Sequence, residues 1–520
     1  MMIIKSPFER LDIPLISLPE YVTEHFEEYG DNIAFVNGAT GEEMSYTQLL
    51  DAIHRVAYSL RNRGFKKGDT LAIYSPNCPE YAAVFFAVAW LGGINTTINP
   101  TYTAEELAFQ LNDSGAHILV TIPGILDKAQ EAASHAGIEE IIVFGEADGA
   151  TSYTTLLGEG KVEQPVACDP EEDLVVLPYS SGTTGLPKGV MLTHTNIVSN
   201  IAQTENIEPA KEEVLIGILP FYHIYGMTVI MSIALRGGAT IVTMPRFDLE
   251  HFLELMQNHK VTVAYLVPPI ILGLAKHPVV DKYDLSSLKQ ITSGAAPLSG
   301  ALSDACGQRL SCVVKQGYGL TETSPVTHIT PLGRTVKPGA VGNSVPNTET
   351  MIVDVATDEP LPPGETGEIW VRGPQVMKGY HNNEAATRAM IDNNGWLHTG
   401  DIGYVDGDGY LYVIDRVKEL IKYKGLQVAP AELEAVLITH PDVADAAVIP
   451  SPDEEAGEVP KAFVVLKPGA TPSADDIKSF VAERVAPYKK IRKLEFTDQI
   501  PKVPSGKILR RELVKRERGG

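Results

Sequence analysis

Residues 179–191 read YSSGTTGLPKGVM, and this stretch decides the fold because it places a hydroxyl-rich glycine loop directly after an apolar run. The apolar run at 174–177 predicts a buried strand that ends where the loop begins. Glycine lets a backbone approach a ligand closely, and Ser and Thr hydroxyls can donate to phosphate oxygens. We therefore expect a phosphate-binding loop. The residues expected to contact phosphate are Ser180, Ser181, Gly182, Thr183, Thr184 and Lys188.

Two other interpretations of this loop fit the sequence less well. A Walker A motif needs Gly-Lys-Ser or Gly-Lys-Thr after its glycines, and no such triplet follows here. A flexible Gly/Ser linker is the plainer alternative. However, Pro187 stiffens the loop, Lys188 charges it, and apolar segments flank it. These features favour a binding loop over a linker.

The overall composition excludes several classes of protein. At 520 residues the chain is too long for one ordinary core, so two or more domains are expected. A formal net charge of −23 argues against nucleic-acid binding, although local Lys, Arg and backbone amides can still bind anions such as ATP. The four cysteines form no CxxC pair, which suits a reducing compartment and no structural metal.

The apolar segments are too short for stable membrane insertion. The longest, 81–94, predicts a buried helix rather than a bilayer span. The N-terminal residues MMIIKSPFERLDIPL lack an apolar core of signal-peptide length. We therefore expect a cytoplasmic protein.

Short β-branched runs alternate with amphipathic helical stretches through the first half of the chain, which predicts α/β layers with largely parallel sheets. Thr103 and Glu106 form a predicted capping box for a helix at 104–112. The runs expected to form strands are 70–74, 116–121, 141–144 and 240–244.

The pattern changes after Asp401 to short strands and Gly/Asp turns, with a predicted hairpin that turns at 406–409. Beyond residue 419 the sequence predicts a small α+β unit with helices near 430–439 and 474–486, the first opened by Pro430. The expected fold class is α/β, with a large N-terminal domain of layered sheets and helices and a small mobile α+β C-terminal domain.

Five sequence blocks, in this order, resemble the signatures of the adenylate-forming superfamily, which includes acyl-CoA synthetases, 4-coumarate:CoA ligases, luciferases and peptide-synthetase adenylation domains. The blocks are the loop above, 219–226 (LPFYHIYG), 316–323 (QGYGLTET), 396–425 and 504–510 (PSGKILR). The resemblance covers almost the whole chain. It implies an N-terminal adenylation domain at 1–417 and a mobile C-terminal domain at 418–520, with a hinge at Lys418.

The resemblance implies an ATP-dependent carboxylic acid:CoA ligase that works through an acyl-AMP intermediate, with ATP, Mg2+ and CoA. Lys507 resembles the catalytic lysine that bridges the carboxylate and the α-phosphate, and Thr321 resembles the α-phosphate contact. Glu322 resembles the carboxylate that holds Mg2+, because a hard cation prefers oxygen ligands. Asp401 resembles the acceptor of both ribose hydroxyls, and Arg416 adds a nucleotide contact.

Further residues complete the expected site. His223 resembles a gate beside the acyl pocket rather than a general base, because the acid is already ionised at neutral pH. The remaining residues expected to contact nucleotide or CoA are Gly317, Tyr318, Gly319, Lys422, Lys424, Gly425 and Gln427. The expected acyl pocket includes Tyr225, Met227, Gly294, Ala295, Pro325 and Val326.

The identity of the acid is open between alternatives. Small, apolar pocket residues suit a medium to long-chain fatty acid or an aromatic propenoate. Trp370 stands where plant 4-coumarate:CoA ligases carry Cys, so we expect a fatty acid first and an aryl acid as the alternative. A carrier-protein loading enzyme and a non-catalytic nucleotide sensor are further alternatives, while Pro325 argues against a luciferase. The expected partners are small molecules, and the protein is expected to be a monomer or homodimer.

Overall fold

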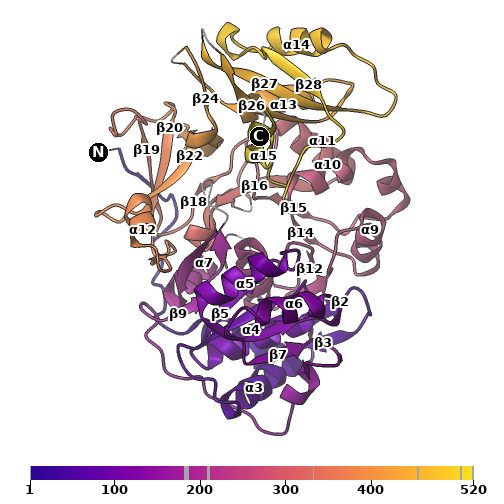
Figure 1. Ribbon diagram of the computed structural model, residues 1–520, viewed down its shortest axis with the longest axis vertical. Helices are drawn as coiled ribbons and strands as arrows, with labels where there is room; N and C mark the ends of the chain where they lie inside the picture. Colours follow the sequence, from indigo (N-terminus) through magenta and orange to yellow (C-terminus); the bar gives the residue numbers. More distant parts are fainter. Residues whose placement is uncertain are drawn as a thin grey trace.

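The computed structural model describes residues 2–180, 187–205, 207, 211–331, 333–424, 426–453, 456–503 and 506–517. Helices and sheets are layered through the N-terminal part, and a smaller sheet with its own helices covers one end of the molecule, drawn in yellow in Figure 1. This arrangement confirms the predicted fold class.

The first α/β sheet carries the predicted phosphate loop at its edge. Its central strands are parallel, whereas the edge strands on either side of the loop are antiparallel. The strands, in spatial order, are β10 (Tyr179–Ser180), β11 (Lys188–Thr193), β9 (Leu174–Val176), β5 (Ile94–Ile98), β4 (Thr70–Tyr74), β6 (Ala116–Thr121), β7 (Glu140–Val143) and β8 (Thr151–Ser152), with β21 (Gly379–Tyr380) paired to β11.

The second sheet is also parallel at its centre and antiparallel at both edges. Its strands are β18 (Asn343–Ser344), β17 (Val326–Ile329), β16 (Val313–Gly319), β15 (Gln290–Ser293), β14 (Val263–Leu266), β12 (Val214–Gly217), β13 (Thr240–Thr243), β2 (Ile33–Asn37) and β3 (Glu43–Ser45). The expected strands at 70–74 and 116–121 have those bounds, and those at 141–144 and 240–244 shift by at most one residue at an end.

Helix α4 (Pro79–Trp90) lies between these two sheets, where it contacts β2 of one and β4 and β5 of the other. This position explains why the segment is apolar all round, since both faces of the helix are covered. The prediction of a buried helix is therefore confirmed. No helix in the described part of the chain is both long enough and apolar enough to cross a bilayer.

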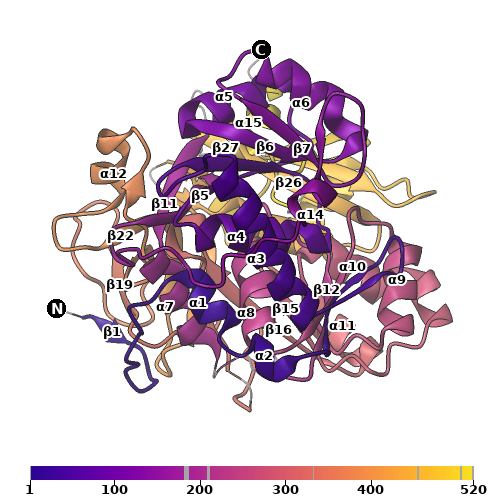
Figure 2. The same cartoon turned by 90° about the horizontal axis from the view of Figure 1, so that it is seen from below.

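The remaining N-terminal helices pack on the sheet faces (Figures 1 and 2). The predicted capping box is present, since Thr103 accepts from the Glu106 amide and Glu106 accepts from the Thr103 amide at the start of α5. These helices are α1 (Leu18–Thr23), α2 (Phe26–Tyr29), α3 (Tyr46–Asn62), α5 (Ala104–Ser114), α6 (Leu126–Ala133), α7 (His194–Glu205), α8 (Ile233–Arg236), α9 (Leu249–Asn258), α10 (Pro268–Lys276) and α11 (Gly300–Leu310).

A third, antiparallel sheet is formed mainly by strands that follow in the sequence, drawn in orange in Figure 1, with the N-terminal strand β1 (Ile4–Lys5) at its edge. The predicted hairpin joins its last two strands, and the Gly409 amide donates to the Asp406 carbonyl in the turn. The strands are β1 (Ile4–Lys5), β19 (Glu349–Val353), β20 (Gly367–Arg372), β22 (Leu397–Val405) and β23 (Leu411–Arg416), with α12 (Glu384–Met390) before β22.

The C-terminal sheet has a hydrophobic core of its own, centred on residues such as Ile421, Leu433 and Val464. Helix α13 begins at Pro430 as predicted, and α14 is shorter than the predicted 474–486. The domain boundary at 417/418 stays a prediction. The elements are β25 (Leu426–Val428), β24 (Ile421–Tyr423), β27 (Gly457–Leu466), β26 (Val443–Asp453), β28 (Lys493–Phe496), α13 (Pro430–Ile438), α14 (Ala474–Ala482) and α15 (Arg510–Glu517).

Candidate active site

A buried carboxylate lies beside the end of the predicted phosphate loop. Glu322 follows β16 in a short 3-10 turn and is 7% exposed. Its Oε1 accepts hydrogen bonds from Ser180 Oγ at 3.0 Å and from the Tyr380 hydroxyl at 2.8 Å. The Lys188 ammonium lies 4.4 Å from the centroid of the Tyr380 ring. Both donors to Glu322 are neutral hydroxyls, and both bond to Oε1.

The turn that carries Glu322 allows only glycine at one position. A Cβ on Gly319 would lie 1.9 Å from the Pro325 carbonyl oxygen, so a side chain there would displace the backbone. At Gly317 the same atom would meet its nearest neighbour at 3.5 Å, an ordinary contact. Thr321, next to Glu322, is half-buried. The atom that lies too close to Gly319 for a side chain is therefore a backbone carbonyl oxygen of this chain, that of Pro325.

A second buried carboxylate, Asp401, joins three strands. It is 5% exposed and accepts from the Tyr318 hydroxyl of β16 at 2.7 Å. Arg416 of β23 lies opposite Asp401 in the sheet, and its Nε is 3.1 Å from Asp401 Oδ1. Burial raises the pKa of Asp401, while Arg416 and Tyr318 act in the opposite direction.

The loop that carries Lys507 reaches this ion pair from the far end of the sequence. A Cβ on Gly506 would lie 2.8 Å from Pro269 of α10, so the loop packs on the N-terminal part of the chain. Burial, followed by the charge of Arg416, lowers the pKa of Lys507, and Asp401 is among the opposing charges. The structure therefore brings Lys507, Arg416 and Asp401 into one electrostatic field.

Arg510, at the start of α15, anchors the same C-terminal tail. Its guanidinium makes ion pairs with Glu419 at 2.7 Å and with Glu434 of α13 at 2.6 Å. Burial raises the pKa of Glu434 to about 7 although Arg510 opposes the shift. Nearby, Asp415 Oδ2 accepts from the Ala431 amide at 2.8 Å and so caps the first turn of α13.

Of the predicted acyl-pocket residues, the structure brings Tyr225 and Gly294 into direct contact. Tyr225 opens a π-helical segment (Tyr225–Ser232), and its hydroxyl donates to the Thr292 carbonyl at 3.1 Å. A Cβ on Gly294 would lie 2.6 Å from the Tyr225 ring, so the glycine leaves the space that this ring occupies.

The other predicted pocket residues are held separately. Met227 is 1% exposed in the main hydrophobic core, and Ala295 has a φ of +67°. Val326 is held by Asn200, which bonds both its amide and its carbonyl.

His223 lies in the loop after β12, where its Nδ1 accepts from the Tyr225 amide at 3.2 Å. Burial lowers the pKa of His223 to about 4, so the imidazole is neutral at physiological pH. Its Nδ1 is occupied by the Tyr225 amide and its lowered pKa makes the ring a weak base, while the role of His223 as a gate stays a prediction.

Several predicted residues lie away from these clusters or outside the described residues. Lys418, Lys422 and Lys424 are exposed near the start of the C-terminal sheet. The residues outside the described ranges are 181–186 of the loop, which include Ser181, Gly182, Thr183 and Thr184, together with Gly425 and the side chain of Gln427.

The structure also shows contacts that the sequence did not single out. Tyr380 contacts both Glu322 and Lys188, yet nothing in its sequence surroundings indicated a role. Trp370 stacks on His398 with ring centroids 3.7 Å apart. Arg510 ends the sequence block at 504–510 without an assigned role, yet it pairs with Glu419 and Glu434.

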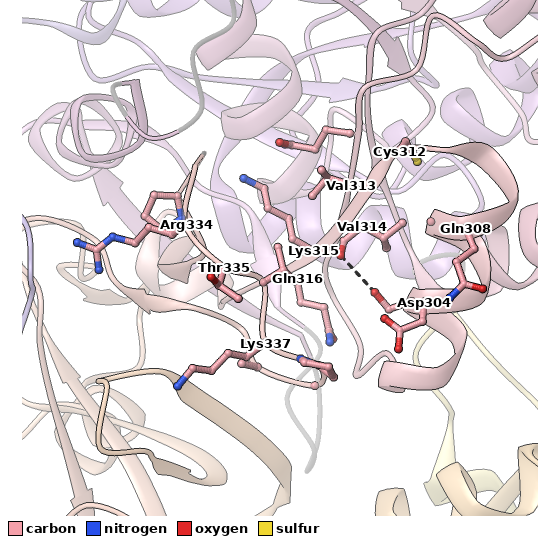
Figure 3. A pocket seen from close by; sticks show the side chains of 18 of the residues that line it. Asp304, Gln308, Cys312, Val313, Val314, Lys315, Gln316, Arg334, Thr335 and Lys337 are labelled. Atoms are coloured by element: carbon pink, nitrogen blue, oxygen red, sulfur yellow. Dashed lines mark hydrogen bonds between the residues drawn. The ribbon is translucent and has the colours of Figure 1, made fainter.

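A cavity of about 600 Å3 lies between α11, the start of β16 and residues 333–340 (Figure 3). None of Glu322, Asp401, Lys507 or Tyr225 is among its lining residues. Its cations already have partners within the protein: Lys315 donates to the Thr330 carbonyl, and Lys337 pairs with two aspartates of the β22–β23 hairpin. This cavity is therefore separate from the candidate site.

Glu322 fits a magnesium ion by its chemistry. In the described residues no group of three or more His, Cys, Asp or Glu side chains forms a metal-binding cluster. Magnesium, however, usually takes only one or two carboxylates and completes its shell with substrate phosphates and water. One buried carboxylate beside a phosphate loop matches that requirement.

Comparisons with known proteins show which family this chain resembles. The family model described as AMP-binding enzyme matches residues 22–381, and the AMP-binding enzyme C-terminal domain matches residues 432–507. 4-Coumarate–CoA ligase 1 of Petroselinum crispum is 45% identical over 523 residues, which cover 98% of this chain and 96% of that protein.

Solved structures resemble the chain over nearly its whole length. ATP-bound MatB from Rhodopseudomonas palustris is 30% identical, with a TM-score of 0.88, and the match covers 96% of this chain and 99% of that one. The anthranilate CoA ligase AuaEII in complex with anthranoyl-AMP is 26% identical, with a TM-score of 0.91 and 98% of both chains covered.

The lowered pKa of His223 predicts a specific response of stability to acid. The neutral ring is favoured in the folded state, so its contribution is present above the unfolded pKa of about 6.5 and is lost as pH falls toward about 4. We expect His223→Gln to lose less unfolding free energy than the wild type between pH 7 and pH 5, by at most about 2 kcal/mol. Urea unfolding at both pH values measures this difference. The exposed His135 supplies a control, His135→Gln, and equal pH dependence in all three proteins would contradict the prediction.

Proposed function

The chain belongs to the AMP-binding enzyme family as an ATP-dependent, AMP-forming acid:CoA ligase, and we propose that its acid is an aromatic propenoate of the 4-coumarate type. The observation that carries this proposal is the similarity to 4-coumarate–CoA ligases, which reaches 45% identity over 98% of the chain. This similarity supports the aromatic alternative over the fatty acid that the sequence analysis ranked first. A fatty acid remains the second candidate.

The sequence argued against an aromatic acid only through Trp370. The position of Trp370 in the structure removes that argument. Trp370 lies on β20 of the third sheet, stacked on His398 and packed against Met351, Val353 and Trp396. It makes no described contact with Tyr225, which meets Gly294 in the expected pocket. The difference at residue 370 therefore carries no information about the acid. A flat aromatic acid suits a pocket with a tyrosine ring as one wall.

The nucleotide is proposed to bind between the two buried carboxylates. The hydroxyl loop and Lys188 would hold the β- and γ-phosphates, and Asp401 would accept the ribose hydroxyls. Glu322 would hold Mg2+, which supplies positive charge to the phosphates when it is bound. The protein carries a net charge of −23, so these local cations are needed to attract ATP.

We propose that Lys507 stabilises the adenylation transition state. The acid's carboxylate oxygen attacks the α-phosphorus, the bond to the bridging oxygen breaks, and pyrophosphate leaves with that electron pair. Negative charge gathers on the α-phosphate oxygens during this step, and an ammonium group placed there lowers the barrier. The buried position of Lys507, at which the charges of Arg416 and Asp401 act on its pKa, supports this role.

The second half-reaction requires a different set of groups. The CoA sulfur attacks the acyl carbonyl carbon, the carbon–oxygen bond to AMP breaks, and the thiol proton passes to solvent. We propose that the chain beyond Lys418 turns about that residue, so that the segment with Lys422, Lys424 and Gly425 replaces Lys507. The exposure of Lys422 and Lys424 in the present orientation supports this exchange, because both side chains reach the surface of the C-terminal unit.

An acid panel tests the proposed function. Purified protein is given ATP, Mg2+, CoA and one acid at a time, from acetate through palmitate to cinnamate and 4-coumarate, and AMP and thioester are measured. We expect kcat/KM for 4-coumarate to exceed that for any fatty acid by at least about tenfold. The reverse order would assign a fatty acid. Pyrophosphate release without thioester would indicate a carrier-loading enzyme.

Lys507→Ala should separate the two half-reactions. We expect adenylation, measured as acid-dependent pyrophosphate release, to fall by about 100-fold or more, because a charge contact in the transition state is lost. Thioester formation from supplied acyl-AMP should remain near the wild-type rate. Lys515→Ala is the matched control, since Lys515 is an exposed lysine of the same tail. Equal loss of both half-reactions would contradict the role of Lys507.

Gly294→Ala tests the proposed acyl pocket. The new Cβ would lie 2.6 Å from the Tyr225 ring and force that ring to shift. We expect the KM for the aromatic acid to rise by about tenfold while the KM for ATP stays unchanged, since a displaced wall removes apolar contact with the acid alone. Gly137→Ala serves as the control because a Cβ there would meet nothing within 4 Å. A larger change in the KM for ATP than for the acid would place Gly294 outside the acyl pocket.

A further inference from the structure

Asp401 projects from an irregular part of β22. On β20, Glu368 and Trp370 are two positions apart, whereas their partners on β22, Ile402 and His398, are four positions apart. Strand β22 therefore carries two additional residues at this point, and Asp401 lies among them. A β-bulge of this kind redirects a side chain, so the direction of the Asp401 carboxylate depends on how the bulge is held.

Strand β20 holds the bulge through hydrogen bonds to Gly400 and to Thr399, the residue before it. Glu368 Oε1 accepts from the Gly400 amide at 2.9 Å, and Gly400 has a φ of +70° that favours glycine. The Thr399 hydroxyl donates to the Ile369 carbonyl at 2.6 Å. The same hydroxyl accepts from the Asp401 amide at 3.1 Å. The backbone of Asp401 is thus tied to β20 through its two preceding residues.

Trp370 orients the Glu368 carboxylate, which accepts the hydrogen bond from the Gly400 amide. Its indole Nε1 donates to Glu368 Oε2 at 3.0 Å, so the two oxygens of one carboxylate are divided between Trp370 and Gly400. The indole ring also stacks on His398 with an interplanar angle of 11° and a centroid distance of 3.7 Å. His398 Nε2 is buried without a hydrogen-bond partner among the described residues, so the stack is the contact that orients this ring.

Packing on the other side limits the movement of Trp370 itself. The indole is half-buried against a small apolar cluster formed by Met351, Val353 and Trp396. A ring held between this cluster and His398 has few alternative rotamers. The hydrogen bond to Glu368 is therefore made by a donor that is already in place.

We propose that Trp370 is a positioning residue for the nucleotide site, which acts through Glu368 and His398 to hold the bulge that directs Asp401 at the ribose. The inference rests on the proposed contact between Asp401 and the ribose hydroxyls. It assigns Trp370, which stands where the resemblance places a Cys in plant 4-coumarate:CoA ligases, to nucleotide binding rather than to the choice of acid. Trp370 itself touches neither substrate.

The test compares ATP with 2′-deoxyATP and 3′-deoxyATP in the wild type and in variants at residue 370. Trp370→Cys removes both the indole donor and the stacked ring, and Trp370→Phe removes only the donor. If the Asp401 carboxylate is misdirected, ATP loses the contact between its ribose hydroxyls and Asp401. Each deoxy nucleotide lacks one of these hydroxyls, so it does not make the full contact even in the wild type. We expect the wild type to use ATP at least about tenfold better, in kcat/KM, than a deoxy nucleotide. Trp370→Cys should reduce this ratio to about one to threefold, with an intermediate ratio in Trp370→Phe.

Trp396→Phe is the matched control, since Trp396 belongs to the same apolar cluster but makes no described contact with Glu368 or His398. It should lower the unfolding midpoint and leave the nucleotide ratio as in the wild type. An unchanged ratio in both Trp370 variants would overturn the positioning role while the role of Asp401 stands. A wild type that does not discriminate against either deoxy nucleotide would overturn both the ribose contact and this inference.

Discussion

The burial of the Asp401 carboxylate is the constraint on which the rest of the site depends. A charged group that is 5% exposed needs partners inside the protein, because an unpaired buried charge costs several kcal/mol. Tyr318 comes from the second sheet and Arg416 from the neighbouring strand of the third sheet. Lys507 enters the same field from the C-terminal tail. One carboxylate therefore joins the second and third sheets through its bonds to Tyr318 and Arg416.

Much of the fold could be predicted because its signals are local. The capping box of Thr103 and Glu106, the proline that opens α13 and the Asp/Gly turn at 406–409 each lie within a few residues of the element they define. Helix α4 was predicted as buried because apolar residues cover both of its faces, and it lies between two sheets. The α14 end was wrong by four residues, since nothing in that segment marks where the helix stops.

The candidate site could be predicted only where its residues belong to sequence blocks. Glu322, Asp401 and Lys507 were found in this way, although their roles stay proposals. Tyr380, which bonds Glu322 from 58 residues away, had no local signal. The stack of Trp370 on His398 depends on the register of two strands, and the pairing of Arg510 with Glu434 depends on how a helix packs beneath the tail. Such contacts arise from tertiary structure, which short sequence patterns do not encode.

The Asp415 cap on α13 is one of the contacts that a turn of the C-terminal tail would break. Asp415 precedes Lys418, whereas Glu419, Glu434 and Arg510 follow it, so a turn about Lys418 would carry that ion-pair network along unbroken. Such a turn would exchange the cap for water at the exposed first turn of α13. Losing one helix cap costs about 1 kcal/mol, which is small beside the binding free energy of a nucleotide. Such a turn would also separate Gly506 from Pro269, and Leu420 and Ala429 from Ile402. A bound substrate therefore decides between the two orientations only where its own contacts outweigh these.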